Sequence, residues 1–334
     1  MYAGVQVDVN VYNYPIEGTL NDNPIYLSDI PRIHSATERY RLAGDGKTLH
    51  LGAPDNPVLQ GHGVTVFLPF NSLSEHGISL GDPGSGKTNT DLVLASEAAA
   101  FLETLVVLDS SGGIAGKLDT LPDVWRSNLH RFRFDAPPER DALASAVLGK
   151  GMRLVETTVE LMPQVFQEIV AVIESSPDPT TGNKERVIRY LLLVEEAAGV
   201  FGKSKGEQEA ASARLIQLLS IAFRKGWCVW LSLQRPSMLG RDAKTRKRVL
   251  GYLGNRLVGV QKSADEVELL ASVFKDEGHT SAEIEYFRRQ VGRLTTGSAL
   301  VRGCEILASK EKSYLPILKT RMRLMDSVPA PAAP

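Results

Sequence analysis

The glycine-rich loop at residues 81–88 constrains the fold of this 334-residue chain more than any other feature. Its sequence, Gly-Asp-Pro-Gly-Ser-Gly-Lys-Thr, satisfies the pattern G-x-x-x-x-G-K-[ST]. A short apolar run at residues 78–80 precedes the loop, and residues 90–105 after it carry apolar positions at helical spacing. Strand, loop and helix in that order are the context in which this pattern binds phosphate. The sequence therefore predicts a nucleotide-binding protein of the α/β class.

The chemistry of this loop suits a nucleoside triphosphate. Its glycines let successive backbone N–H groups converge on the phosphates, and the following helix adds the positive end of its dipole. Lys87 would reach the β- and γ-phosphate oxygens, and the Thr88 hydroxyl would ligate Mg²⁺. We therefore expect ATP and Mg²⁺ as cofactors. The residues expected to contact the nucleotide are Gly81, Asp82, Pro83, Gly84, Ser85, Gly86, Lys87, Thr88 and Asn89.

Three further apolar runs end in polar residues, as strands that face a binding site do. They are residues 104–108 before Asp109, residues 190–194 before Glu195 and Glu196, and residues 229–233 before Gln234. Helical patterns separate the runs, which favours a mainly parallel sheet flanked by helices. In such a sheet the ligand binds at the carboxyl ends of the strands. The polar residues are therefore expected at one edge, beside the glycine-rich loop.

The two adjacent glutamates are candidates for the second half of a hydrolytic site. Glu195 would join the Mg²⁺ shell, and Glu196 would polarise the attacking water. A solvated helix start with two acids is the alternative interpretation of the same residues. Gln234 is expected to sense the γ-phosphate, because its amide can donate to phosphate and orient water. The alternative for Gln234 is an ordinary surface turn, with Pro236 merely ending the strand.

The rest of the chain divides by composition. Residues 1–75 are rich in Pro, Asn, Gly and β-branched residues and are expected to form a small β-rich region. Residues 76–326 are the expected ATPase domain, and residues 327–334 a disordered tail. Within the domain, residues 143–175 are predicted to be helical with an interruption near Pro163. Residues 201–212 are predicted to be a polar, mobile segment.

Charge and cysteine content limit the classes of partner. With 38 basic and 39 acidic residues the net charge is −1, so any contact with nucleic acid must use a local basic patch. Such a patch is offered by residues 241–262, with a solvated helix face as the alternative. Its basic residues are Arg241, Lys244, Arg246, Lys247, Arg248, Arg256 and Lys262.

No secretion or metal framework is visible in the sequence. Cys228 and Cys304 lie far apart and suggest neither a disulfide nor a zinc site. The N-terminal residues fit no export signal, and the apolar runs are shorter than the ~20 residues of a membrane-spanning helix. We expect no membrane insertion and a cytoplasmic location, or association with a virion if the protein packages a genome.

The motifs together resemble the HerA/FtsK superfamily of DNA-translocating ATPases over residues 50–320. The resemblance is carried by His76, the phosphate-binding loop, the run LVVLDSSGG, the run LLLVEEA and the run WLSLQRPS. It implies a RecA-like P-loop fold, a homo-oligomeric ring such as a hexamer, and ATP-driven movement of double-stranded DNA of any sequence. Two departures are Glu195 in place of the usual Asp, and Gly113 where an acid often follows the Asp-x-x-Gly turn.

The resemblance also implies an arginine that reaches into the neighbouring subunit's ATP. Arg224 lies near the expected position, at the end of the helical stretch before the Gln234 strand, and Arg214 is a weaker candidate. Basic residues also gather at helix ends through the dipole alone. Capsid, secretion-channel and nuclease partners all fit a motor of this type. The alternative function is an ATP-dependent switch or assembly protein that changes protein partners without moving DNA.

Overall fold

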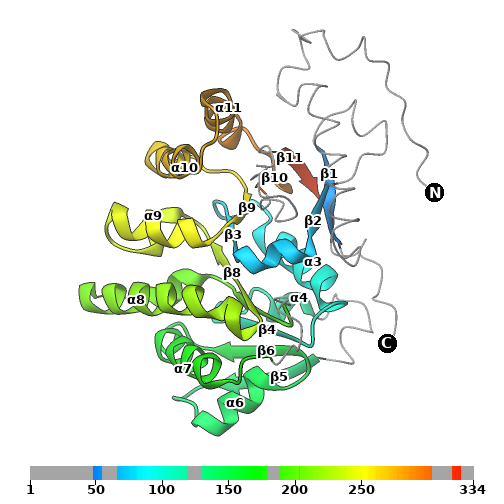
Figure 1. Ribbon diagram of the computed structural model, residues 1–334, viewed down its shortest axis with the longest axis vertical. Coiled ribbons are helices and arrows are strands. Elements are labelled where there is room, and N and C mark those ends of the chain that lie inside the picture. The colour runs from blue at the N-terminus through cyan, green and yellow to red at the C-terminus, as the bar shows by residue number, and fades with distance from the viewer. Residues whose placement is uncertain are drawn as a thin grey trace, which may run out of the picture.

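Eleven strands of the computed structural model form one continuous sheet in the order β2-β1-β11-β10-β9-β3-β8-β7-β4-β6-β5 (Figure 1). The structure describes residues 48–54, 66–118, 129–179, 188–202, 204–302 and 318–324. In the order of the sheet, the parallel strands are β9 (Asn255–Val258), β3 (Gly77–Leu80), β8 (Trp227–Leu233), β7 (Tyr190–Val194), β4 (Thr104–Asp109), β6 (Gly151–Thr157) and β5 (Leu129–Phe134). The antiparallel strands are β10 (Ser298–Arg302), β11 (Leu318–Met322), β1 (Thr48–Pro54) and β2 (Val66–Pro69).

Helices cover both faces of this sheet, which explains why its central strands are apolar along their whole length. Every residue of β4 and β8 is buried. One face carries α3 (Lys87–Ala99), α4 (Ala115–Leu118) and the 3-10 helix η3 (Phe70–Glu75). The other face carries α6 (Arg140–Leu148), α7 (Met162–Ser175), α8 (Lys205–Ala222), α9 (Ala243–Tyr252), α10 (Ala264–Asp276) and α11 (Ser281–Val291), as Figure 1 shows. The core therefore forms two layers, one on each side of the sheet.

The four strands predicted from the apolar runs are β3, β4, β7 and β8. They are neighbours in the order β3-β8-β7-β4, and all four run parallel. Their carboxyl ends therefore lie at one edge of the sheet, as the sequence predicts. The α/β class and the mainly parallel sheet are confirmed.

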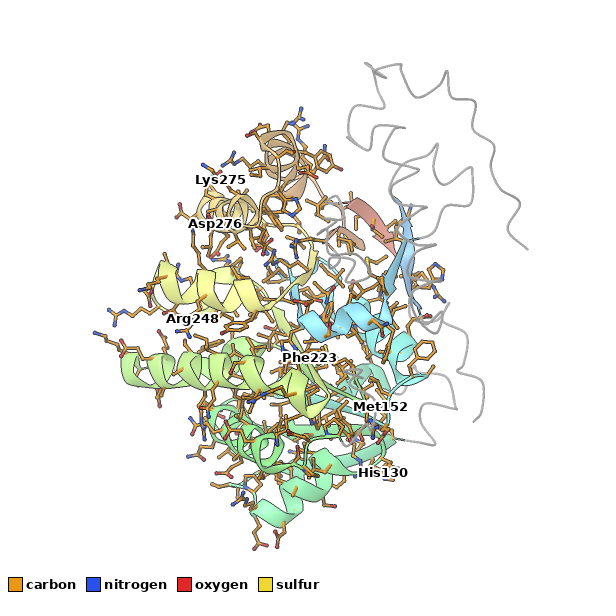
Figure 2. All side chains as sticks on the ribbon, in the orientation of Figure 1. His130, Met152, Phe223, Arg248, Lys275 and Asp276 are labelled. Atoms are coloured by element: carbon orange, nitrogen blue, oxygen red, sulfur yellow. The ribbon has the colours of Figure 1, made fainter. Side chains whose placement is uncertain are left out.

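The prediction that residues 143–175 are helical is wrong in its middle. The strand β6 lies there, between α6 and α7, and pairs in parallel with β4 and β5. Gly149 ends α6 in an extended conformation, and Gly151 has a φ of 88°, so the chain turns before Met152, which Figure 2 labels on β6. Pro163 does not interrupt a helix but lies in the first turn of α7, where its missing N–H costs nothing.

The prediction of a mobile segment at residues 201–212 is also wrong. Helix α8 begins within it, and Ser204 and Glu207 form a capping box. The Ser204 hydroxyl accepts from the Glu207 N–H at 3.3 Å, and the Glu207 carboxylate accepts from the Ser204 N–H at 2.7 Å. Ala211 and Leu215 then bury the helix against the core. The polar residues of this stretch are the capped first turn of a helix.

Two strands of the expected β-rich region are described, and both belong to the same sheet as the nucleotide loop. Strand β1 pairs with β2 on one side and with β11 on the other. The expected boundary between residues 75 and 76 stays a prediction. Residues 1–47 and 55–65 and the predicted tail at 327–334 lie outside the described residues. None of the described helices is long and apolar enough to cross a membrane.

Candidate functional site

The glycine-rich loop connects the end of β3 to the start of α3 at the carboxyl edge of the sheet. Its first N–H, from Gly81, donates to the Leu233 carbonyl at 3.3 Å, so the loop begins against the end of β8. Gly86 has a φ of 99° directly before α3, a conformation that favours glycine. The N–H groups of the first turn of α3 therefore face this edge. We call residues 81–88 the phosphate loop.

Thr88 and Glu195 meet at the base of the phosphate loop. The Thr88 hydroxyl donates to Glu195 Oε1 at 2.8 Å, although 107 residues separate the two. Lys87 lies beside them and donates from Nζ to the Gly81 carbonyl at 2.8 Å. The structure thus brings together the residues that the sequence predicts for the phosphates and for Mg²⁺.

The Glu195 carboxylate is held where a cation would stabilise it. Glu195 is 2% exposed, and its Oε2 has no hydrogen-bond partner among the described residues. Burial raises the pKa of Glu195, the negative charges of Glu196 and Asp109 raise it further, and the hydrogen bond from Thr88 lowers it. An unpaired buried carboxylate oxygen next to a hydroxyl is a fitting set of hard oxygen ligands for Mg²⁺. These residues therefore fit the metal that the phosphate loop implies.

Glu196 and Gln234 lie next to each other because β7 and β8 are parallel neighbours. Gln234 Nε2 is 3.3 Å from Glu196 Oε2 and 3.4 Å from Oε1. Glu196 has a φ of 46° and a ψ of 50°, a left-handed conformation that costs about 1–2 kcal/mol for a residue with a Cβ. The left-handed conformation of Glu196 turns the chain between β7 and the 3-10 helix η4 (Ala197–Phe201). It leaves the Glu196 carboxylate half-buried at the edge of the sheet.

The carboxylate of Asp109, at the end of β4, is occupied by the backbone. Its Oδ1 accepts from the N–H groups of Ser111 and Gly112, both at 2.9 Å. Its Oδ2 accepts from the N–H groups of Ile114 and Ala115, both at 3.0 Å. Asp109 therefore folds the turn into α4.

The other residues expected to contact the nucleotide lie in and beside the phosphate loop. Pro83 and Gly84 form its exposed tip, and Ser85 is buried beneath it. Asp82 accepts from the Lys262 N–H at 3.2 Å through Oδ2 and pairs with Arg235 Nε at 3.8 Å through Oδ1. Asn89 Nδ2 donates to the Arg323 carbonyl at 2.8 Å. The side chains of Asp82 and Asn89 thus hold the loop against neighbouring segments.

Arg224 lies at the opposite edge of the sheet. It belongs to the 3-10 helix η5 (Phe223–Lys225), which precedes β8, whereas Gln234 follows β8. Seven strand residues span roughly 23 Å, so Arg224 cannot reach the phosphate loop of its own chain. Its side chain is exposed, whereas Lys225 pairs with Asp178 at 2.8 Å. The weaker candidate, Arg214, is 3.4 Å from Glu174.

The basic stretch at residues 241–262 is not one continuous surface. Arg256 is fully buried and donates to Glu277 Oε2 at 2.7 Å, so the prediction that it offers charge to DNA is wrong. Its exposed members outside strand β9 include Arg241, Lys244 and Arg248, and Figure 2 shows Arg248 on the outer, helical side of the molecule. Lys247 pairs with Asp276 at 3.1 Å, and Arg246 donates to the Gly240 carbonyl at 2.6 Å.

His76, which in the sequence is part of the family resemblance, joins three elements at the start of β3. Its Nδ1 accepts from the Val229 N–H at 3.2 Å, which leaves Nε2 to donate to the Leu219 carbonyl at 2.9 Å. Burial lowers the pKa of His76 to about 4, so the ring is neutral at pH 7. His76 therefore holds β8 and the end of α8 against the start of β3.

No family model and no curated protein sequence matches the chain. Among solved structures, it is similar to the plasmid coupling protein TrwB in complex with the non-hydrolysable GTP analogue GDPNP. That match has 12% identity and a TM-score of 0.50 and covers 88% of this chain and 94% of the TrwB chain. Two further matches are EssC (ATPases 2 and 3) from Geobacillus thermodenitrificans and the genome packaging NTPase B204 from Sulfolobus turreted icosahedral virus 2.

The EssC match has 14% identity and a TM-score of 0.47 and covers 84% of this chain but 45% of the EssC chain. This chain thus spans less than half of that relative. The B204 match has 13% identity and a TM-score of 0.38 and covers 73% of this chain and 99% of that one. At these identities the TrwB match establishes the fold. The chain has the RecA-like P-loop NTPase fold, and the resemblance to HerA/FtsK-type ATPases is confirmed at the level of the fold.

Proposed function

We propose that this protein hydrolyses ATP with Mg²⁺ and uses the energy to move double-stranded DNA as a homo-oligomeric ring. The observation that carries the hydrolytic part is the convergence of four side chains from one helix and the ends of two strands. Thr88 contacts Glu195 at 2.8 Å, and Gln234 contacts Glu196 at 3.3 Å, all beside the phosphate loop. A protein that only bound nucleotide would not need Glu196 and Gln234 beside the phosphate loop.

Each of these residues has a role that its position allows. The Lys87 ammonium group would leave the Gly81 carbonyl and donate hydrogen bonds to the β- and γ-phosphates. Thr88 and Glu195 would hold Mg²⁺. The bound metal would neutralise charge on the phosphate oxygens. Glu196 would accept the proton of the attacking water, and the Gln234 amide would orient that water against the γ-phosphate.

A ring is proposed because Arg224, the arginine that the family resemblance implies for the site, lies too far from the phosphate loop of its own chain. Arg224 is exposed at the edge of the sheet opposite the phosphate loop. When two subunits pack with opposite edges in contact, Arg224 of one would reach the γ-phosphate in the other and stabilise charge in the transition state. The hydrolytic site would then be complete only in the assembly.

Arg224→Ala is therefore expected to lower kcat without weakening ATP binding, because the group acts mainly in the transition state. Mixing subunits tests whether it acts in trans. An inactive Glu196→Gln subunit that still carries Arg224 should partly rescue an Arg224→Ala neighbour. The measurement is steady-state hydrolysis as a function of the mixing ratio. Arg189→Ala removes an arginine that lies just before β7 and pairs with Glu103 at 3.4 Å, and serves as the control. Absence of rescue at every ratio would contradict the trans role.

Double-stranded DNA is proposed as the substrate of the motor on two grounds. Arg241, Lys244 and Arg248 offer exposed positive charge in and just before α9. TrwB, which shares the fold, is a plasmid coupling protein. Contacts of Lys and Arg to phosphate oxygens carry no sequence information, which suits a pump that must pass any sequence. Capsid, secretion-channel and nuclease partners remain compatible with this function.

Duplex DNA of arbitrary sequence is expected to stimulate hydrolysis, and the stimulation should fall steeply with salt because each phosphate contact releases counterions. Replacing Arg241, Lys244 and Arg248 by Ala should reduce the salt slope by about one unit per real contact while leaving DNA-free hydrolysis unchanged. The control variant replaces Arg140, Lys150 and Lys275, three exposed basic residues on other elements, and changes the net charge equally.

The same experiment separates the motor from its alternative. If hydrolysis is indifferent to DNA at low salt with oligomers present, the translocase is rejected and an ATP-dependent switch that changes protein partners is the better account. If DNA stimulates hydrolysis but the triple substitution behaves like its control, the motor stands and the DNA lies on another surface.

A further inference from the structure

A short segment that follows β9, residues 259–262, runs along one side of the phosphate loop. The Gly259 N–H donates to the Leu80 carbonyl at 2.7 Å, and the Asp82 N–H donates to the Val260 carbonyl at 2.9 Å. The Lys262 N–H donates to Asp82 Oδ2 at 3.2 Å. Three hydrogen bonds within four residues therefore fix this segment relative to the beginning of the loop.

Gln261, in the middle of the segment, reaches the end of β8. Its Nε2 donates to the Gln234 carbonyl at 2.8 Å. The side chain is deeply buried, since Gln261 is 1% exposed, and its Oε1 has no partner among the described residues. A buried amide with an unpaired oxygen costs free energy. An apolar residue of the same size would avoid that cost, so the bond to Gln234 is the evident use of the amide.

The contacts around Gln261 form a closed network that links the phosphate loop, the segment 259–262 and the end of β8. The phosphate loop is joined to the end of β8 by the Gly81 N–H on the Leu233 carbonyl at 3.3 Å and by the Asp82–Arg235 pair at 3.8 Å. The segment 259–262 is joined to the phosphate loop through Asp82, and to β8 through Gln261. Gln234 belongs to this network through its carbonyl, and its side-chain amide lies 3.3 Å from Glu196.

We propose that Gln261 is a positioning residue for hydrolysis, which fixes the Gln234 backbone so that the Gln234 amide stays between Glu196 and the γ-phosphate. The proposal rests on the proposed roles of Gln234 and Glu196. Gln261 would act through its hydrogen bond to the Gln234 carbonyl. A displacement of about 1 Å at a reacting group can cost on the order of a hundredfold in rate, so one well-placed hydrogen bond can matter to kcat.

The matched pair Gln261→Met and Gln290→Met tests the proposal in the full-length protein. Both replace a buried glutamine by an apolar residue of similar length, and Gln290 lies in α11 with no side-chain hydrogen bond among the described residues. Gln261→Met should lower kcat by about tenfold or more while changing KM and the affinity for ATP by less than about threefold. Gln290→Met should match the wild type in all three quantities.

Gln261→Glu supplies a readout that a merely structural role would not produce. An ionised carboxylate cannot donate to the Gln234 carbonyl, but a protonated one can, and burial raises its pKa toward neutrality. The ratio of kcat between this variant and the wild type should therefore rise at least about threefold as the pH falls from about 8.5 to about 6.5. Taking the ratio at each pH removes pH effects that the two proteins share. The charged groups around this position are Asp82, Arg235, Lys262 and Glu196.

The outcomes distinguish this inference from the function on which it rests. Gln234→Ala is measured alongside; if it hydrolyses ATP like the wild type, the role of Gln234 is wrong and the inference falls with it. If Gln234→Ala is impaired while Gln261→Met is not, the inference alone is overturned. Should Gln261→Met fail to fold, the Gln261→Glu ratio decides: a ratio that does not change with pH overturns the inference.

Discussion

Lys87→Ala is expected to weaken ATP binding by about a hundredfold or more. The lysine is the cation placed at the base of the phosphate loop, and charge-assisted hydrogen bonds contribute about 1.5–3 kcal/mol each. Two such contacts, to the β- and γ-phosphates, account for a loss of that size. Titration calorimetry with a non-hydrolysable ATP analogue and Mg²⁺ measures it directly. Hydrolysis should be lost with the affinity.

The fold should survive this change. Lys87 is half-buried, and among the described residues its Nζ donates to the Gly81 carbonyl at 2.8 Å, an acceptor that water can also satisfy. Lys205→Ala, which removes an exposed lysine paired weakly with Glu209 at 3.9 Å, is the matched control. Unchanged affinity in Lys87→Ala, at an unchanged melting temperature, would show that the nucleotide does not bind at this loop.

Glu196→Gln is expected to stop hydrolysis while ATP and Mg²⁺ stay bound. The amide keeps the shape of the side chain but cannot accept the proton of the attacking water, and general-base catalysis contributes about 10²–10⁴-fold. Single-turnover kinetics with radiolabelled ATP separates binding from the chemical step. A trapped ATP complex that persists for many wild-type turnover times is the expected result.

The choice of glutamine matters because Glu196 has a φ of 46°. Glycine at this position would relieve backbone strain and change both stability and position, whereas glutamine carries the same strain as glutamate. Glu209→Gln, an exposed residue on α8, controls for the loss of one negative charge. If Glu196→Gln turns over at the wild-type rate, another group serves as the base.

The sequence predicted the edge on which the site lies because two independent signals agree there. The phosphate loop needs a strand before it, and three other apolar runs end in Asp109, Glu195 and Gln234. Buried parallel strands are apolar throughout, so these runs stand out from the helices around them. The positions of Thr88, Glu195, Glu196 and Gln234 follow from the order of the four strands. Their chemical roles stay predictions.

The residues that the sequence did not reveal depend on contacts between distant segments. Arg256 is neutralised by Glu277, and Gln261 is linked to Gln234 across 27 residues. The sequence does not reveal strand β6 for a different reason: its apolar residues Met152, Leu154 and Val155 fit a short helix as well as a strand. Gly149 before the strand, Gly151 at its first position and the pairing with β4 and β5 decide between helix and strand.

The order of strands in the sheet affects when the phosphate loop can fold during synthesis on the ribosome. Strand β3 carries the phosphate loop, yet its hydrogen-bonded neighbours are β8 and β9, which follow it by about 150 residues or more. At a synthesis rate of about 5–20 residues per second, the loop waits roughly 7–30 s for its first neighbouring strand. A nascent chain thus carries the phosphate-binding motif well before it has the sheet that shapes it. ATP can be captured in native geometry only after β8, which ends at Leu233, has been made.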